Sequence, residues 1–354
     1  MIYVFRIGSL GDSLVTLPAL KSIKRQYPDD KITLITHVAS KDCVSCWDVL
    51  KYAEVFTDVL FFELDNITSI VNIALAIRKT HTRNKLYYVQ PFRARSQVMK
   101  DYFLWKILAN FDEIIGLSQS RYPKLREENG KLLVLESEYD RLLKIVSPIK
   151  GKKENNIKCE DKLPLLQPQK ENYQVIKEML PPDSKSKTMV AISFGSNMAS
   201  KQWPIDRFHK LISELNKERQ DLFFVLVGGN KEVAEGESLS NSFDNCTSFA
   251  GKTSVIESAA LLEKCTLFIG NDTGTMHLAA IMGTPVIALF SARDNPGKWE
   301  PYGMDNHIIM KKVECAGCML TSCHEFDNKC IKLITVHEVL QLANESLPIK
   351  PMFI

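Results

Sequence analysis

The sequence predicts an α/β protein with two parallel-sheet domains, on three observations. Strand-like apolar segments alternate with amphipathic helical segments, and this alternation stops and then restarts around residues 147–170. The interrupting segment is polar, contains prolines and has no periodicity, which is typical of a linker. A chain of 354 residues is also long for a single domain. We therefore expect one domain over residues 1–165, a second over 166–333, and a final helical segment, 334–354, that packs across their junction.

Composition narrows the class of protein. Hydrophobic residues make up 45% of the chain and charged residues 25%, as in ordinary globular proteins. A net charge of +3, with no basic stripe interleaved with aromatic residues, argues against a nucleic-acid partner. No apolar run approaches the roughly 18 residues of a membrane span, and the first residues resemble a strand rather than a signal peptide. Nine cysteines, an odd number, indicate reduced thiols and a cytoplasmic location.

The first predicted strand, Tyr3 to Ile7, leads into a glycine-bearing turn that ends at Asp12. A helical pattern follows it, so this turn lies where α/β folds place ligands. The turn is not G-x-G-x-x-G, and no acidic residue is clearly placed about 20 positions further on, which disfavours dinucleotide binding. Asp12 is a candidate general base. The alternative is that Asp12 is an ordinary helix-capping carboxylate.

Further along the first half, basic residues follow a predicted strand at 85–89. Arg93 and Arg95 open a helix that runs to about residue 109, and their position suits an anionic acceptor. The alternative is a solvated helix face, which is the more common role of such charges.

In the second half, three predicted strands end in small or polar residues. These ends are Gly195-Ser196, Gly228-Gly229 and Asp272-Thr273-Gly274. Because the strands of a parallel sheet end at one edge, their backbone N–H groups would cradle a phosphate there, with Lys201 as the cationic partner. Asp272 ends its strand directly before a helix, so its carboxylate would hold a sugar hydroxyl or act only as an N-cap.

Four cysteines lie close together near the end of the chain. Their spacing, Cys315-x2-Cys318-x4-Cys323-x6-Cys330, suits a tetrahedral zinc or iron ion. A cluster of reduced thiols that stabilises a loop is an equally good interpretation.

Several of these segments together resemble the heptosyltransferases, glycosyltransferase family nine. The match runs from the first strand to the last helix, includes the late Cys-x2-Cys segment, and is loose over roughly residues 40–130. The motifs are Arg6-Ile7-Gly8-Ser9-Leu10-Gly11-Asp12, Leu17-Pro18-Ala19-Leu20, Lys201-x-Trp203-Pro204 and Gly270-Asn271-Asp272-Thr273-Gly274-x-x-His277-Leu278-Ala279-Ala280.

The resemblance implies a GT-B fold, two Rossmann-like domains facing across a cleft. It also implies an inverting bacterial enzyme that needs no metal or other cofactor. Such an enzyme moves a sugar, most often heptose from ADP-heptose, onto a lipopolysaccharide or related cell-surface glycan. The acceptor would be met at the cytosolic face of the inner membrane, and the resemblance allows peripheral contact with that membrane.

The resemblance also assigns roles to residues. Asp12 matches the general base, and Gly11, Arg93 and Arg95 lie on the acceptor side. The residues expected to bind the donor are Ser196, Lys201, Thr253, Asp272, Thr273, Gly274 and His277. Gly195-Ser196-Asn197 has fewer hydroxyls than the family pattern, so the particular sugar and acceptor stay open.

Three other interpretations remain. One is a glycosyltransferase of the same fold that uses another nucleotide sugar. Another is a dehydrogenase, which the missing glycine fingerprint disfavours. The third is a non-catalytic nucleotide- or metal-binding protein whose main feature is the cysteine cluster.

Overall fold

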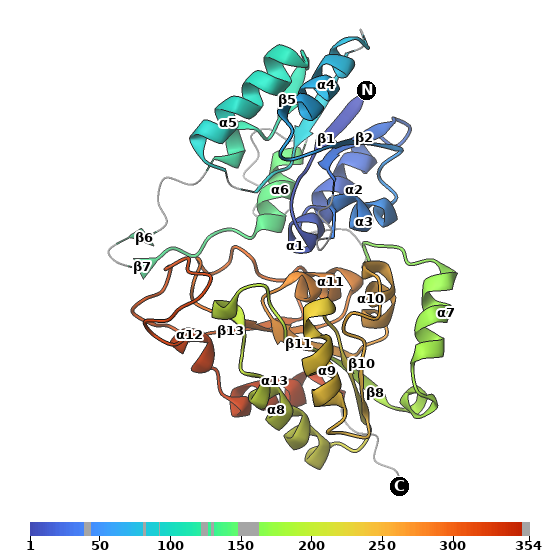
Figure 1. The fold of residues 1–354 in the computed structure, drawn as a ribbon, viewed down its shortest axis with the longest axis vertical. Helices are drawn as coiled ribbons and strands as arrows, with labels where there is room; N and C mark the ends of the chain where they lie inside the picture. The colour runs from blue at the N-terminus through green and yellow to red at the C-terminus, as the bar shows by residue number, and fades with distance from the viewer. Residues whose placement is uncertain are drawn as a thin grey trace. The chain divides into compact units, whose positions relative to one another are not determined.

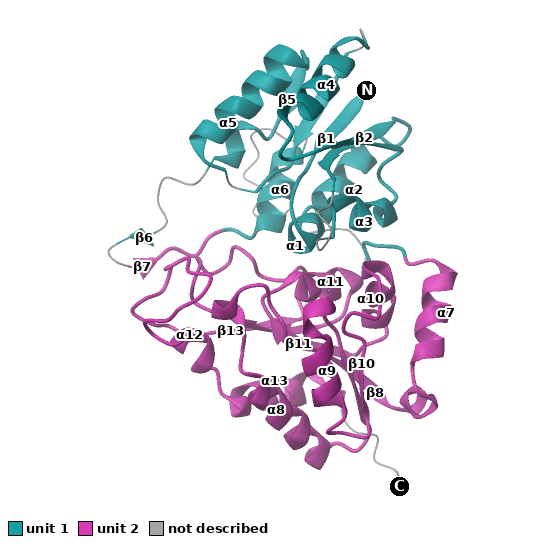
Figure 2. Ribbon diagram, viewed as in Figure 1, with its two compact units in different colours: residues 1–129, 136–167 teal, residues 130–135, 168–354 magenta. Residues whose placement is uncertain are grey.

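A computed structural model describes residues 1–38, 44–80, 83–91, 93–121, 127–128, 131–147 and 163–348. The chain forms two compact units (Figure 2). Unit 1 comprises Met1–Asn129 and Glu136–Gln167, and unit 2 comprises Gly130–Leu135 and Pro168–Ile354. The change of unit at residue 167 falls inside the predicted linker, most of which lies outside the described residues.

Unit 1 contains a parallel five-stranded sheet in the order β3-β2-β1-β4-β5 (Figure 1). Its strands are β1 (Ile2–Phe5), β2 (Ile32–His37), β3 (Asp58–Phe62), β4 (Lys85–Tyr88) and β5 (Glu113–Ile115). Its helices are α1 (Leu10–Leu14), α2 (Leu17–Gln26), α3 (Cys46–Leu50), η1 (Lys51–Ala53), α4 (Ile67–Arg78), α5 (Arg95–Tyr102), the π-helix η2 (Phe103–Leu108), η3 (Ser118–Ser120) and α6 (Glu138–Val146). Two short strands precede α6: β6 (Glu127–Glu128), which belongs to unit 1, and β7 (Lys131–Leu132), which belongs to unit 2.

The core of unit 1 follows from the alternation of side chains along β1. Tyr3 and Phe5 belong to an aromatic cluster with Trp105 of η2, and the Phe5 and Trp105 ring centroids are 5.0 Å apart. Val4 lies between them on the opposite face of the strand and is also fully buried. Burial on both faces explains why β1 is continuously apolar.

Unit 2 contains a parallel six-stranded sheet in the order β10-β9-β8-β11-β12-β13. Its strands are β8 (Thr188–Ser193), β9 (Leu222–Leu226), β10 (Cys246–Ser248), β11 (Leu267–Asn271), β12 (Val286–Phe290) and β13 (Asn306–Met310). Its helices are α7 (Lys170–Met179), η4 (Pro182–Ser186), η5 (Ala199–Lys201), α8 (Ile205–Glu218), η6 (Asn230–Glu232), α9 (Val233–Ser240), α10 (Val255–Leu262), α11 (Gly274–Met282), α12 (Lys329–Lys332) and α13 (Val336–Ser346).

The last helix, α13, packs against α8 and adds Val339 and Ala343 to the core of unit 2. Its expected packing across the junction stays a prediction. Among the described residues, no helix is both long enough and apolar enough to cross a membrane.

Three details differ from the sequence prediction. The sequence of residues 248–251 predicts a short strand there, but the observed strand β10 lies earlier, at Cys246–Ser248, because the chain turns at Gly251 with φ +68°. The short edge strands β5 and β13 were not predicted. β13 is only partly buried, so it lacks the continuous apolar run that marks the central strands.

Candidate active site

In unit 2, the three predicted strand ends do lie on one edge of the sheet. β8 is hydrogen-bonded to β9 on one side and to β11 on the other, and all three strands run in parallel. The loops that begin at Phe194, Val227 and Asp272 are therefore neighbours, and the predicted common edge is confirmed.

Lys201 and Asp272 meet at this edge. Lys201 ends the short helix η5, and its Nζ lies 2.5 Å from Asp272 Oδ2. The two side chains are only 15% and 9% exposed, so a full positive and a full negative charge are paired in a nearly dry place. A ligand phosphate placed here would share the lysine with Asp272.

Asn271 joins the two loops that carry this ion pair. Its buried amide donates from Nδ2 to the carbonyl oxygens of Phe194, at 2.6 Å, and Gly195, at 3.3 Å. Its Oδ1 accepts from the backbone N–H of Trp203 at 3.1 Å. One buried side chain thus fixes the end of β11 to the loop after β8, on both sides of Lys201.

The start of α11 offers N–H groups at the same edge. Its N-cap is Thr273, so Asp272 is not the N-cap that the alternative interpretation required. In the described part of the chain, the Thr273 side chain does not cap the helix. Its Oγ1 instead lies 2.8 Å from Thr275 Oγ1, which lies 2.9 Å from Ser193 Oγ. The first-turn N–H groups, starting with that of Gly274, therefore have the orientation that binds anions.

The remaining predicted donor residues lie on or near this edge. Ser196 follows β8, and its Oγ accepts from Met198 N–H at 3.2 Å. Thr253 lies in the loop after β10, where its Oγ1 pairs with Ser258 Oγ at 2.7 Å. Gly251 N–H, in the same loop, donates to the carbonyl of Gly228. His277 is buried in the first turns of α11.

Sequence reasoning missed Glu232, whose carboxylate lies among the glycines of this edge. Its Oε2 accepts from Gly229 N–H at 2.8 Å. A Cβ added to Gly195 would lie 2.4 Å from Glu232 Cγ, so the glycine is required for this approach. The available signal was the pair Gly228-Gly229 followed three residues later by an acid, which is the spacing of a capping box.

In unit 1, Asp12 is held at the carboxyl end of β1. Its Oδ2 accepts from the N–H and the Oγ of Ser9, at 2.9 and 2.8 Å. Asp12 therefore does cap α1, as the alternative interpretation predicts, and its role as a general base stays a prediction. Its Oδ1 lies 3.9 Å from the guanidinium of Arg6, which is fully buried and also donates to the Asp12 carbonyl. Gly8, at φ +149°, is needed here because a Cβ would lie 2.4 Å from Asp12 Cβ.

The buried guanidinium of Arg6 holds Asp12 in place at the end of β1. Burial lowers the pKa of its guanidinium, and the negative charge of Asp12 opposes that effect. Its NH1 donates to the carbonyl of Val89, at the end of the neighbouring strand β4, at 2.7 Å. Arg6 therefore ties together the two strand ends from which the predicted acceptor-side residues come.

The acceptor-side residues differ in their surroundings. Gly11 lies inside α1 and is half-buried. Arg93 is paired with Asp101, with 3.2 Å between NH1 and Oδ2, and Asp101 also accepts from Tyr88. Burial and Asp101 raise the pKa of the Tyr88 hydroxyl, which thus stays protonated. Arg95 opens α5 and is exposed.

The cysteine segment braces the loop that carries Lys201. Ser200 Oγ donates to the carbonyl of Leu320, between Cys318 and Cys323, at 2.8 Å. Arg293 donates to the same carbonyl, also at 2.8 Å. Among the described residues, no three His, Cys, Asp or Glu side chains are grouped to hold a metal ion. Burial and the neighbouring thiols raise the pKa of Cys315, which favours neutral thiols.

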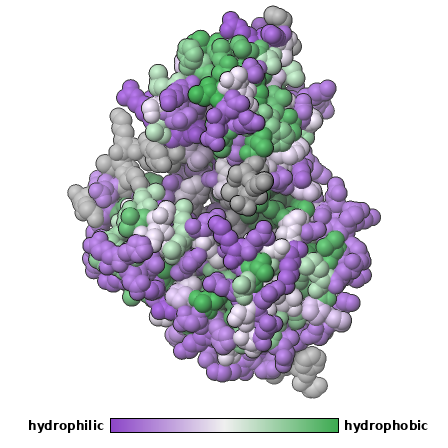
Figure 3. All heavy atoms as spheres, viewed as in Figure 1, coloured by the Kyte–Doolittle hydropathy of each residue, from purple (hydrophilic) through white to green (hydrophobic). Residues whose placement is uncertain are grey.

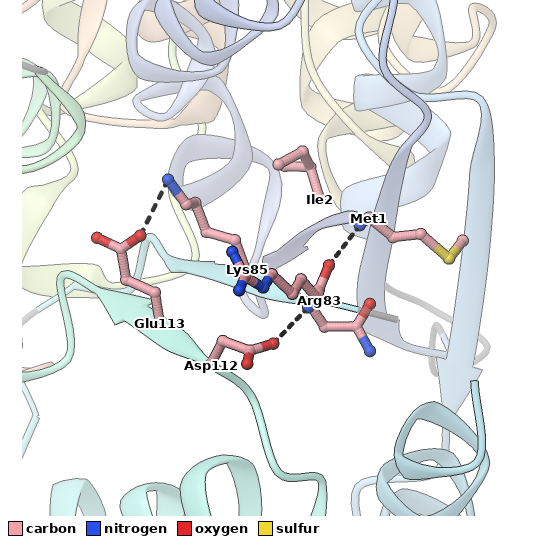
Figure 4. A pocket seen from close by; sticks show the side chains of 7 residues that line it. Met1, Ile2, Arg83, Lys85, Asp112 and Glu113 are labelled. Carbon is pink, nitrogen blue, oxygen red and sulfur yellow. Dashed lines mark hydrogen bonds and ion pairs between the residues drawn. The ribbon is translucent and has the colours of Figure 1, made fainter. Parts of the chain in front are cut away.

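A pocket of about 430 Å³ lies in unit 1 at the opposite edge of the sheet, where β1, β4 and β5 begin (Figure 4). Its polar groups pair with one another. Lys85 Nζ is 2.9 Å from Glu113, and Asp112 accepts from the Asn84 N–H at 2.7 Å. None of the predicted site residues lines this pocket.

The known proteins that this chain resembles include several heptosyltransferases. The sequence profile described as "Glycosyltransferase family 9 (heptosyltransferase)" matches residues 140–327, more than half of the chain. Lipooligosaccharide heptosyltransferase 2 of Haemophilus influenzae is 33% identical over 120 residues, 32% of this chain. That match covers only 34% of the relative's length, and two further curated heptosyltransferases match over 43% and 36% of theirs.

Solved structures share the fold, and two of them are members of the same family. A glycosyltransferase family 9 protein from Veillonella parvula superposes with a TM-score of 0.73 at 17% identity, covering 98% of this chain and 96% of that one. The ADP-heptose lipopolysaccharide heptosyltransferase II of E. coli superposes with a TM-score of 0.66 at 17% identity, covering 98% of both chains. The expected GT-B fold class, with two Rossmann-like units, is confirmed.

Proposed function

Because the chain belongs to glycosyltransferase family 9, the heptosyltransferases, we propose that it transfers heptose from ADP-heptose to a lipopolysaccharide-type acceptor. The solved relative from E. coli is described as acting with ADP-heptose, and the curated relatives as lipopolysaccharide or lipooligosaccharide heptosyltransferases. The odd number of cysteines supports a cytoplasmic location, and peripheral contact with the inner membrane is part of the proposal.

The Lys201–Asp272 pair beside the start of α11 is the observation that carries this proposal. We assign the donor pyrophosphate to Lys201 and to the N–H groups of Thr273 and Gly274. When the bond to the sugar breaks, negative charge develops on the leaving ADP, and these donors stabilise it without rearranging. We assign Asp272 and Glu232 to hydroxyl groups of the donor, because carboxylates accept hydrogen bonds from hydroxyls.

We assign the acceptor step to Asp12. Its Oδ1 removes the proton from an acceptor hydroxyl while that oxygen bonds to the anomeric carbon and the bond to ADP breaks, with inversion. Arg6 holds Asp12 through its carbonyl and balances its charge. Attack in line with the leaving group requires unit 1 and unit 2 to present Asp12 and the donor to the same acceptor.

Calorimetric titration with ADP-heptose, followed by a transfer assay, tests the donor assignment. We expect Lys201→Ala to weaken ADP-heptose binding about 10- to 100-fold, because a charged hydrogen bond to phosphate is lost. The control is Lys210→Ala, which removes an exposed lysine from α8 and is expected to leave affinity unchanged. Equal ADP-heptose affinity of wild type and Lys201→Ala would show that this lysine does not bind the donor.

The same titration separates the alternatives. Tighter binding of another nucleotide sugar would indicate a different donor within the same fold, and binding of NAD would favour a dehydrogenase. Donor binding with no transfer to any glycan acceptor would indicate a non-catalytic protein.

A further inference from the structure

One face of unit 1 exposes a group of large apolar side chains on α5 and η2. Val98, Asp101 and Trp105 form the inner face of this helical segment and are buried. The outer face carries Met99, Tyr102, Phe103 and Ile107, which are 54%, 45%, 61% and 50% exposed. Spacings of three and four residues put these side chains side by side. Figure 3 shows hydrophobic residues gathered on the part of unit 1 where Figure 1 places α5.

Basic residues lie beside this apolar group, and the helical segments that form it carry no exposed acid. Exposed acids flank these segments at Glu63 and Asp65, before α4, and at Asp112 and Glu113, after η2. Within residues 95–108 the only acid is Asp101, which is buried and paired with Arg93. The adjacent helix α4 contains no acidic residue between 67 and 78. Its end lies against η2, because Arg78 NH1 donates to the carbonyl of Ile107 at 3.2 Å. We call eight of the exposed residues at the end of α4 and along α5 and η2 the α5 surface: Leu75, Arg78, Lys79, Met99, Lys100, Tyr102, Phe103 and Ile107.

The α5 surface begins beside the acceptor-side edge of the same unit. α5 starts two residues after Arg93, which follows β4, and β4 is paired with β1, the strand that leads to Asp12. A lipid-linked acceptor whose lipid lies against α5 would thus have its sugar portion near the carboxyl edge of the sheet.

We propose that the α5 surface docks on an anionic phospholipid bilayer. Aromatic and aliphatic side chains beside lysine and arginine are what an interfacial surface needs: the apolar groups enter the headgroup region while the cations contact lipid phosphates. A second copy of the chain fits this surface less well. In a two-fold dimer formed through this face, the basic residues of one copy would lie close to those of the other and repel them. The inference builds on the proposed acceptor, but bilayer binding requires neither donor nor acceptor.

Vesicle flotation tests the inference without heptosyl transfer. The probes are vesicles of phosphatidylethanolamine with phosphatidylglycerol, and vesicles of phosphatidylcholine alone. We expect wild-type protein to bind the anionic vesicles at least about tenfold more strongly, and added salt to weaken that binding. Lys79→Glu combined with Lys100→Glu is expected to lower binding to anionic vesicles at least about tenfold. Phe103→Ser combined with Ile107→Ser is expected to lower it by a similar factor.

The matched control is Met304→Ser with Lys210→Glu, which changes one exposed apolar residue and one exposed lysine of unit 2. This control is expected to bind vesicles like wild type. Because Lys79 and Lys100 are exposed, the charge variant is expected to keep its melting temperature and thus to report on binding alone. Absence of wild-type binding, or an equal loss in the control, would overturn the proposal. So would a wild-type dimer in sedimentation equilibrium that Phe103→Ser converts to monomer, since the occupant would then be a second copy.

Discussion

At the scale of single residues, Asp12 combines the two roles that its sequence position left open. One carboxylate oxygen caps α1 through Ser9, and the other lies beside Arg6. A cap uses only an acceptor oxygen, whereas a general base needs the negative charge. The two roles can therefore be separated by a substitution that keeps the oxygen and removes the charge.

Asp12→Asn makes that separation. We expect the turnover rate to fall about 100- to 10,000-fold, the usual range for loss of a general base, while ADP-heptose affinity stays close to wild type. The melting temperature is expected to fall, because the buried Arg6 loses the negative charge beside it. The measurements are initial rates, donor titration and thermal unfolding. Ser9→Ala is the control: it removes one hydrogen bond to the carboxylate and should lower stability modestly while turnover persists. Full activity in Asp12→Asn would leave Asp12 with its capping role alone.

At the scale of elements, the ends of β8 and β11 hold the donor side together through Asn271. Its buried amide makes hydrogen bonds to Phe194, Gly195 and Trp203, which flank the Lys201 loop. Asn271→Leu, which keeps the branched shape of the side chain, leaves these buried backbone groups unpaired. We expect a loss of about 2–4 kcal/mol in the free energy of unfolding and weaker ADP-heptose binding. Urea unfolding and calorimetric titration measure the two effects.

A matched amide elsewhere in unit 2 provides the control. Asn216 of α8 is half-buried and pairs with Asn245, which precedes β10 and so lies away from the carboxyl edge. Asn216→Leu should cost stability without changing donor affinity. If both variants bind ADP-heptose equally well, Asn271 does not position the donor site.

The start of α13 adds a pH-dependent contribution to stability. Lys311 and the N–H of Thr335 lower the pKa of Glu338 from 4.5 to about 2. Because the folded-state pKa is lower than the unfolded one, this contribution is present above pH 4.5 and is lost as the pH falls towards 2. We expect Glu338→Gln to be less stable than wild type near neutral pH, with the difference shrinking over that range. Urea unfolding at several pH values measures it, and a constant difference would contradict the prediction.

At the scale of the whole molecule, the two units have separate hydrophobic cores and divide the proposed tasks. All proposed donor residues lie in unit 2, and Asp12, Arg93 and Arg95 lie in unit 1. We expect scanning calorimetry to show two transitions, of which ADP-heptose raises the one that belongs to unit 2, because a ligand stabilises only the structure that binds it. Lys201→Ala should reduce the shift at the same ADP-heptose concentration, because it weakens binding. Equal shifts of both transitions would mean that the donor contacts both units.

The sequence by itself determined the fold class and the position of the donor edge. Periodicity and turn residues are local signals, so the alternation of strands and helices and the three strand ends with small or polar residues were readable. Only the tertiary structure decided what depends on neighbours distant along the chain. It paired Lys201 with Asp272, gave Asn271 its partners, brought Glu232 against Gly195 and joined Arg6 to the carbonyl of Val89. These residues meet because of the order in which the strands lie in each sheet. A local sequence pattern does not encode that order.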